Sequence, residues 1–172
     1  AANSSTEVVA IERNLAQNTD LGESLLGSTL IVVSADEPQG LKDSIDQYSV
    51  RERTPWISAG YNGTTGLCGP LFVPNTTGCL ACSSNTFSDI DAARSLPLLS
   101  DLHRRYHPPS FGPLNGIVAS ITAYEVIAFL SGVLPEVSSM GASLSIETPS
   151  FAVRRTSWDR NPNCKRCNSG AL

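Results

Sequence analysis

Four of the five cysteines form two pairs with the same spacing. Cys79 and Cys82 lie in "TGCLACSSN", and Cys164 and Cys167 lie in "NPNCKRCNSG". A C-x-x-C turn directs two sulfur atoms toward one point, so two such turns supply the four thiolates of a tetrahedral zinc site, with zinc–sulfur distances of about 2.3 Å. Because four protein ligands leave no position for water or substrate, the zinc is predicted to be structural.

The alternatives for these cysteines are two redox motifs or four unrelated free thiols. A thioredoxin-like motif places C-x-x-C at the start of a helix that follows a strand, and neither pair has that setting. The metal would instead close a long loop and anchor the C-terminal segment. Cys68 stands apart in "GLCGP". It is predicted to be a small buried side chain, with a catalytic thiol as the alternative.

Asp36 is the candidate for ligand chemistry, because it directly follows the apolar run "LIVVSA". In doubly wound sheets, ligands bind outside the carboxyl ends of the strands. A carboxylate there suits Mg²⁺ beside the phosphates of a nucleotide. The alternative is a helix N-cap formed by Asp36 or Ser34, and the residues alone leave the two interpretations even.

The apolar pattern predicts the elements that must position these residues. Leu30 to Val33 is an unbroken run that suits a strand buried on both faces of a parallel sheet. With a following helix and the strand "TPWISAG" it forms a β-α-β unit, which continues into a hairpin that turns near Asn62-Gly63. The remaining predictions are a helix over about 5–17, a helix over 41–53, a buried helix over about 114–131, and two short strands in "ASLSIETPSFAVRRTSW".

Composition limits the function classes. The 172 residues are 41% hydrophobic and 16% charged, which is typical of a globular chain. The net charge of −4 argues against nucleic acid as the main partner. No signal peptide and no uninterrupted apolar run of about 20 residues is visible, so neither a membrane span nor secretion is expected. We therefore expect a cytoplasmic protein, where paired cysteines more often bind metal than form disulfides.

The motifs in their order resemble the ThiF–MoeB superfamily, the adenylating fold of ubiquitin-activating enzymes. The matching stretches are "LIVVSADEP", "PWISAGYNGTTGLCGPLFVP", "CLAC", "NGIVASITAYEVIAFLSG" and "NPNCKRC". Within that group the sequence is most similar to the MccB-type enzymes that adenylate the microcin C peptide. The resemblance covers nearly the whole chain, and the combined order of the motifs is specific although each is modest alone.

The resemblance implies an α/β, Rossmann-like adenylating fold, in which a parallel sheet continues into antiparallel strands beside a structural zinc. It implies that ATP and Mg²⁺ are bound and that a nucleotide is transferred to a peptide C-terminal carboxylate. Asp36 matches the family aspartate that supports Mg²⁺ and nucleotide, and the four cysteines match the zinc ligands. Residues 85–113 match the crossover segment that covers the substrate, and a homodimer is implied.

One departure concerns the nucleotide loop. The family's glycine-rich loop precedes the first helix, and no G-x-G-x-x-G occurs in the 172 residues. Residues 1–172 are therefore expected to be the C-terminal part of an adenylation domain, and the catalytic Arg and Lys of the N-terminal part cannot be assigned. The alternatives to a peptide adenylyltransferase are a ThiF-like module that captures a leader peptide for a partner enzyme, and a MoeB-like activator of a sulfur-carrier protein.

Overall fold

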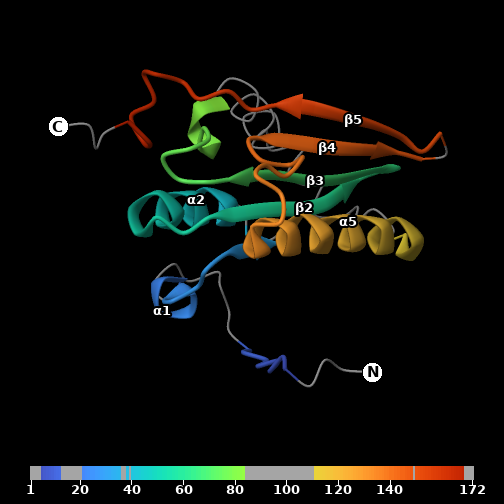
Figure 1. Cartoon of the computed structure of the whole chain (residues 1–172), viewed down its shortest axis with the longest axis horizontal. Helices are drawn as coiled ribbons and strands as arrows, with labels where there is room; N and C mark the ends of the chain where they lie inside the picture. Colours follow the sequence, from blue (N-terminus) through green and yellow to red (C-terminus); the bar gives the residue numbers. More distant parts are fainter. Residues whose placement is uncertain are drawn as a thin grey trace, which may run out of the picture.

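The computed structural model describes residues 5–12, 21–35, 38, 40–83, 111–148 and 150–168. Its centre is a five-stranded sheet in the order β1-β2-β3-β4-β5, whose strands run side by side in Figure 1. The strands are β1 (Ile31–Val33), β2 (Trp56–Asn62), β3 (Thr65–Phe72), β4 (Ala142–Glu147) and β5 (Ala152–Ser157). The helices are α1 (Leu21–Leu25), α2 (Leu41–Glu52), the short 3-10 helix η1 (Leu80–Ser83) and α5 (Gly112–Ser131).

The strand directions confirm the predicted α/β class. β1 pairs with β2 in parallel, with Ile31 opposite Trp56, and α2 crosses between them. All later neighbours are antiparallel. The β2–β3 hairpin turns at Gly63, whose φ of 59° lies in the left-handed region that a tight hairpin turn requires. The parallel pair thus continues into antiparallel strands, as the sequence predicted.

Two hydrophobic clusters lie on the two faces of the sheet. Trp56 and Ile57 are neighbours in β2 and both are fully buried, but side chains alternate along a strand, so they belong to different clusters. Trp56 packs with α1, α2 and Phe72. Ile57 packs with Leu71 and with Ala128 of α5. Each face of β2 and β3 is therefore covered by a helix.

Three sequence predictions need correction. Residues 5–12 form no helix, because Val8 (87% exposed) and Ile11 (65% exposed) have no surface to pack on; residues 13–17 lie outside the described part. β1 is buried on one face only, since Val32 is 49% exposed and α5 covers β2 and β3 instead. The predicted helix over 114–131 is present as α5, but only five of its 20 residues are buried, and Tyr124 and Ile127 lie on the surface.

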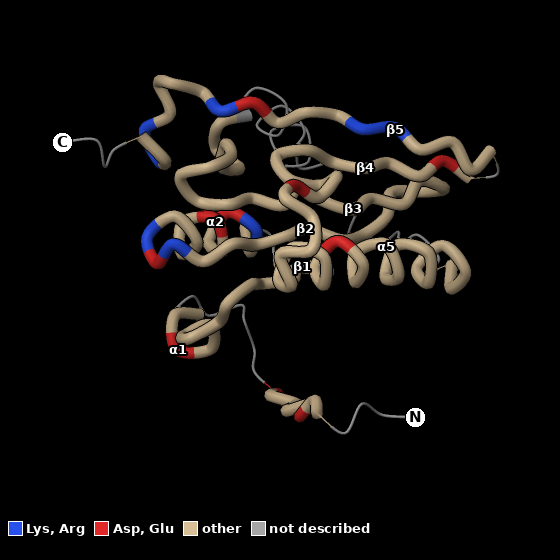
Figure 2. The backbone as a smooth tube through the Cα atoms, in the orientation of Figure 1, with Lys and Arg blue, Asp and Glu red and all other residues tan. Residues whose placement is uncertain are grey.

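The length and apolar composition of α5 would also allow it to cross a membrane, with a mean hydropathy of 1.5. A single such helix is weak evidence, because core helices of folded domains meet the same criterion. α5 packs along β2 and β3. Its one charged residue, Glu125, is 3% exposed and accepts hydrogen bonds from the backbone N–H (2.8 Å) and the hydroxyl (2.7 Å) of Ser139, so it lies in the core. The tube of α5 is otherwise in the tan of uncharged residues in Figure 2.

α5 approaches β3 closely at Gly66. A Cβ atom at this position would lie 2.6 Å from Cγ2 of Val118 and 3.0 Å from Cδ1 of Leu114. We expect Gly66→Ala to push the helix away and to lower the free energy of unfolding by about 1–3 kcal/mol, measured by urea denaturation. Gly60→Ala is the matched control, because a Cβ there meets nothing within 4 Å. Equal stability of the two variants would contradict the close packing.

Candidate functional site

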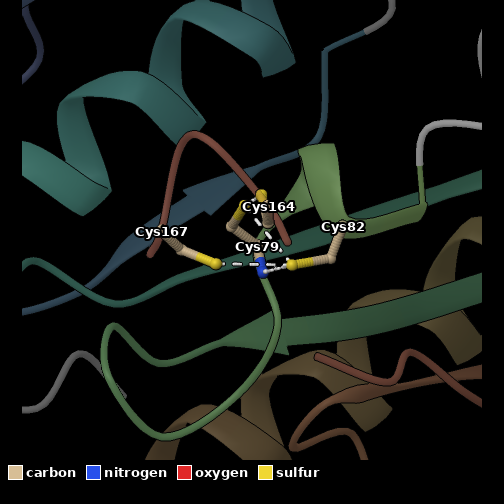
Figure 3. Close-up of side chains that lie close together, drawn as sticks. All are labelled: Cys79, Cys82, Cys164 and Cys167. Atoms are coloured by element: carbon tan, nitrogen blue, oxygen red, sulfur yellow. Dashed lines mark hydrogen bonds between the residues drawn. The ribbon is translucent and has the colours of Figure 1, made fainter. Parts of the chain in front are cut away.

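The two cysteine pairs converge, although 85 positions separate each of the cross-pairs in the sequence. The sulfur atoms lie 3.8 Å apart between Cys79 and Cys82, 3.6 Å between Cys79 and Cys164, and 3.4 Å between Cys82 and Cys167. All four sulfurs lie within 4.8 Å of one another and point toward a common centre (Figure 3). The structure thus brings together the four residues that the sequence paired only by spacing.

The first pair follows the end of β3. The chain turns at Val73, whose carbonyl accepts hydrogen bonds from the backbone N–H groups of Thr76 (3.0 Å) and Thr77 (2.9 Å). A tight turn then brings the N–H of Cys82 to the carbonyl of Cys79 at 3.0 Å. This turn opens η1 and leaves both thiols on one side. We refer to residues 79–82 as the first knuckle.

The second knuckle, residues 164–167, is positioned by contacts of the segment that precedes it, residues 158–161. The N–H of Cys164 donates to the carbonyl of Asn161 at 3.0 Å. Upstream, the ring of Trp158 stacks edge-on against Phe72 at 5.7 Å between centroids. Arg160 donates to the carbonyl of Asn75 at 3.0 Å, so the segment after β5 lies beside the turn that leads to the first knuckle.

Tight backbone contact between these two segments occurs at Gly78. A Cβ atom at Gly78 would lie 3.0 Å from the carbonyl oxygen of Asp159 and 3.2 Å from Cα of Arg160. No bulkier residue fits there without moving the backbone. The aromatic stack, the Arg160 hydrogen bond and this contact together bring the knuckles into register.

The sulfur geometry fits zinc. A tetrahedron with zinc–sulfur bonds of about 2.3 Å has sulfur–sulfur edges of about 3.8 Å. Three sulfur pairs lie 3.4–3.8 Å apart, and all pairs lie within 4.8 Å. A disulfide requires about 2.05 Å, and all four cysteines are free. Four converging thiols form a donor set that suits zinc and completes its coordination. Bound zinc would stabilise the two knuckles and would have no open position for chemistry.

The local environment acts differently on the individual thiols. Burial favours the neutral form of Cys79, and the nearby charge of Asp46 adds to this, so its pKa is raised well above the usual 9.0. Burial also acts on Cys164, but hydrogen bonds from the backbone N–H groups of Cys167 and Arg166 outweigh it and lower the pKa of Cys164 to about 7. The backbone of the second knuckle therefore favours the thiolate of Cys164, whereas burial raises the pKa of Cys167.

The sequence did not point to two residues of this centre, Asp46 and Arg166. Asp46 of α2 is 1% exposed, and its carboxylate accepts hydrogen bonds from the backbone N–H of Leu80 (3.0 Å) and from Arg166 (2.8 Å). Leu80 lies between the two cysteines of the first knuckle, and Arg166 lies between the two cysteines of the second. The available signal was weak: an acidic residue between the apolar positions Ile45 and Tyr48 of an amphipathic helix.

Cys68 is confirmed as a buried side chain. It is fully enclosed between β2, β4 and α5, and it accepts a 3.4 Å hydrogen bond from the hydroxyl of Thr122. Burial raises the pKa of its thiol, with a smaller lowering by Thr122 and a raising by Glu125. A neutral, enclosed thiol is a packing residue and is not available as a nucleophile.

The predicted nucleotide-binding residue, Asp36, lies outside the described residues, as does Glu37 beside it. β1 ends at Val33, so Asp36 follows the carboxyl end of a parallel strand in the chain. The first cysteine pair comes after Phe72, at the end of β3. Phe72 pairs with Trp56 at the start of β2, so β3 ends at the edge of the sheet opposite to the carboxyl end of β1. Of the predicted substrate-covering segment, 85–113, only residues 111–113 are described.

Comparisons with known proteins agree with this fold. A model of the ThiF family matches residues 1–166. The HesA vegetative protein of Trichormus variabilis is 25% identical over 147 residues, which are 86% of this chain and 49% of HesA. The chain therefore spans about half the length of this curated relative.

Solved structures extend the likeness. Escherichia coli MccB in complex with AMPCPP and selenomethionine MccA matches with a TM-score of 0.77 and 30% identity, over 91% of this chain and 44% of MccB. MccB alone matches with a TM-score of 0.78 and 28% identity, over 94% of this chain and 45% of MccB. The heterocyclase TruD, at 22% identity and a TM-score of 0.59, shares the fold alone.

Proposed function

The chain belongs to the ThiF family, as its motifs predicted, and on that premise we propose that it contributes to ATP-dependent adenylation of the C-terminal carboxylate of a ribosomal peptide. The observation that supports this is the 30% identity to MccB along 91% of the chain. The matching MccB structure contains an ATP analogue, AMPCPP, and MccA. The chain corresponds to 44% of MccB, so the proposal concerns the natural protein that carries this sequence.

The reaction is a nucleotidyl transfer. A carboxylate oxygen of the peptide attacks the α-phosphorus of ATP, the bond to the bridging oxygen breaks, and pyrophosphate leaves with the electron pair. Catalysis of this kind depends on positioning and charge neutralisation more than on a protein nucleophile. We propose that Asp36 binds the Mg²⁺ that neutralises the phosphates, and that residues 85–113 cover the peptide.

The test is to incubate the natural protein with ATP, Mg²⁺ and a panel containing the MccA peptide, peptides encoded beside its gene and a carrier protein that ends in Gly-Gly. Pyrophosphate release together with a peptide heavier by one AMP supports the proposal. Peptide binding in calorimetry without pyrophosphate release would replace it by a leader-peptide-binding module. Adenylation of the carrier protein alone would replace it by a sulfur-carrier activator.

We also propose that the natural protein is a homodimer, with α5 in the interface. Its surface carries the apolar side chains of Tyr124 (61% exposed), Ile127 (66% exposed) and Leu130 (51% exposed), and the helix has no exposed charge. Apolar patches of this kind mark interaction sites. We also propose a cytoplasmic location, and the net charge of −4 argues against a nucleic-acid partner.

The expected result for the natural protein is a dimer mass in light scattering at micromolar concentration. Ile127→Asp places a charge in the proposed interface and should shift the mass to that of a monomer, since an unpaired charge cannot be buried there at low cost. Val153→Asp is the matched control: Val153 is 63% exposed, but it lies on β5. A monomer mass for the unmodified protein would refute the homodimer.

A further inference from the structure

The carboxylate of Asp46 contacts both knuckles of the cysteine centre at once. Its Oδ1 accepts a hydrogen bond from the backbone N–H of Leu80 in the first knuckle at 3.0 Å. Its Oδ2 accepts a hydrogen bond from a terminal nitrogen of Arg166 in the second knuckle at 2.8 Å. Oδ1 also accepts a bond from the indole N–H of Trp56 at 3.2 Å, which fixes the carboxylate against β2. One side chain of α2 therefore joins the two halves of the centre.

Arg166 connects this carboxylate to a metal-ligand sulfur. Its guanidinium spans two acidic residues of α2, with 2.8 Å contacts to both Asp46 and Asp43. Its own backbone N–H faces the sulfur of Cys164 as a hydrogen-bond donor. The side chain is thus held by α2, and the main chain lies beside the sulfur of Cys164. A single residue therefore contacts both Asp46 and the sulfur of Cys164.

The burial of these groups makes the contact energetically important. Asp46 is 1% exposed, and the side chain of Arg166 is 22% exposed, so their ion pair is shielded from water and salt. Removing one member of a buried pair leaves the other with an uncompensated charge. The Asp43 side chain is 50% exposed, so its contact with Arg166 is screened and contributes less.

We infer that Asp46 is a positioning residue of the metal centre, which holds both C-x-x-C knuckles in coordination geometry and slows the release of the metal. The inference rests on the proposal that the cysteine cluster binds zinc. Residues that orient metal ligands from outside the coordination sphere typically change metal affinity by about 10–100-fold when they are replaced. For Asp46, both sets of ligands are affected together.

The experiment measures the rate of zinc release from the natural protein to a chromogenic chelator. Asp46→Asn keeps an oxygen for Leu80 and Trp56 but replaces the charged partner of Arg166 by a neutral amide. We expect it to release zinc about tenfold faster or more. In the cobalt-substituted protein, the d–d absorption bands of the tetrahedral site should shift or weaken. Arg166→Lys should behave similarly, because one ammonium group cannot span both carboxylates.

Two controls separate positioning from general stability. Glu52→Gln removes a carboxylate from the same helix that contacts Arg51 and neither knuckle, so zinc release should not change. Ile45→Val weakens the packing of α2 next to Asp46, so its melting temperature should fall while the cobalt spectrum stays unchanged.

Zinc release from Asp46→Asn and Arg166→Lys at the unmodified rate would overturn the inference and leave the metal site standing. Fast release from Ile45→Val, with the same cobalt spectrum as Asp46→Asn, would also overturn it, since Asp46 would then act through stability alone. An unmodified protein that binds no zinc would overturn both the inference and the metal site. If Asp46→Asn does not fold, Arg166→Lys, at a partly exposed position, decides.

Discussion

A protein in which Cys164 and Cys167 are both replaced by serine is expected to contain no zinc and to lose the fold of residues 158–168, and the unmodified protein is expected to contain one zinc per chain. Two sulfurs cannot complete the tetrahedron, and serine hydroxyls are poor zinc ligands. The free energy of structural zinc binding is on the order of 10 kcal/mol at neutral pH, comparable to the whole stability of a domain.

The C-terminal segment has few other contacts that could replace the metal. It is held by the stack of Trp158 on Phe72, by the hydrogen bonds of Arg160 and by the Arg166 ion pairs. Elemental analysis by mass spectrometry gives the zinc content, and limited proteolysis shows whether the segment has opened. The sheet should stay folded, because its two clusters do not depend on residues beyond Trp158.

Cys68→Ala is the matched control for this double replacement. It removes the fifth cysteine, which lies in the hydrophobic cluster around Ile57 and contacts Thr122. One zinc per chain should therefore remain. Zinc that persists after both Cys164 and Cys167 are replaced would contradict the four-cysteine assignment.

The second large effect is expected at Asp36. In the natural protein, Asp36→Asn should reduce pyrophosphate release by about a hundredfold to a thousandfold while the melting temperature stays unchanged. Asparagine retains the shape and one oxygen but not the charge, and losing an ion contact in the transition state costs several kcal/mol, with about 1.4 kcal/mol for each tenfold. A helix N-cap would tolerate the change, because asparagine caps as well as aspartate.

Glu37→Gln is the control for this second prediction. It removes the neighbouring carboxylate, which is expected to point away from the ligand if Asp36 points toward it, and so it should leave nucleotide transfer nearly unchanged. Near-normal pyrophosphate release by Asp36→Asn would refute the magnesium-binding role and leave the N-cap interpretation.

Local patterns in the sequence were sufficient for the strands and helices that a neighbouring surface covers. Leu41, Ile45 and Tyr48 repeat at helical spacing, and all three are buried in α2. The same kind of stripe at Val8 and Ile11 predicted a helix that residues 5–12 do not form. The difference is physical: apolar periodicity stabilises a helix only where another surface buries its apolar face.

The sequence by itself determined which residues are the candidate metal ligands, because the C-x-x-C spacing is a short-range constraint that a single turn satisfies. Only the tertiary structure decided what surrounds them. Asp46 lies 34 positions from Leu80 and 120 positions from Arg166, yet it bonds to both. No local pattern encodes such a contact, since it depends on how α2 packs against the sheet and on where two distant segments meet beside it.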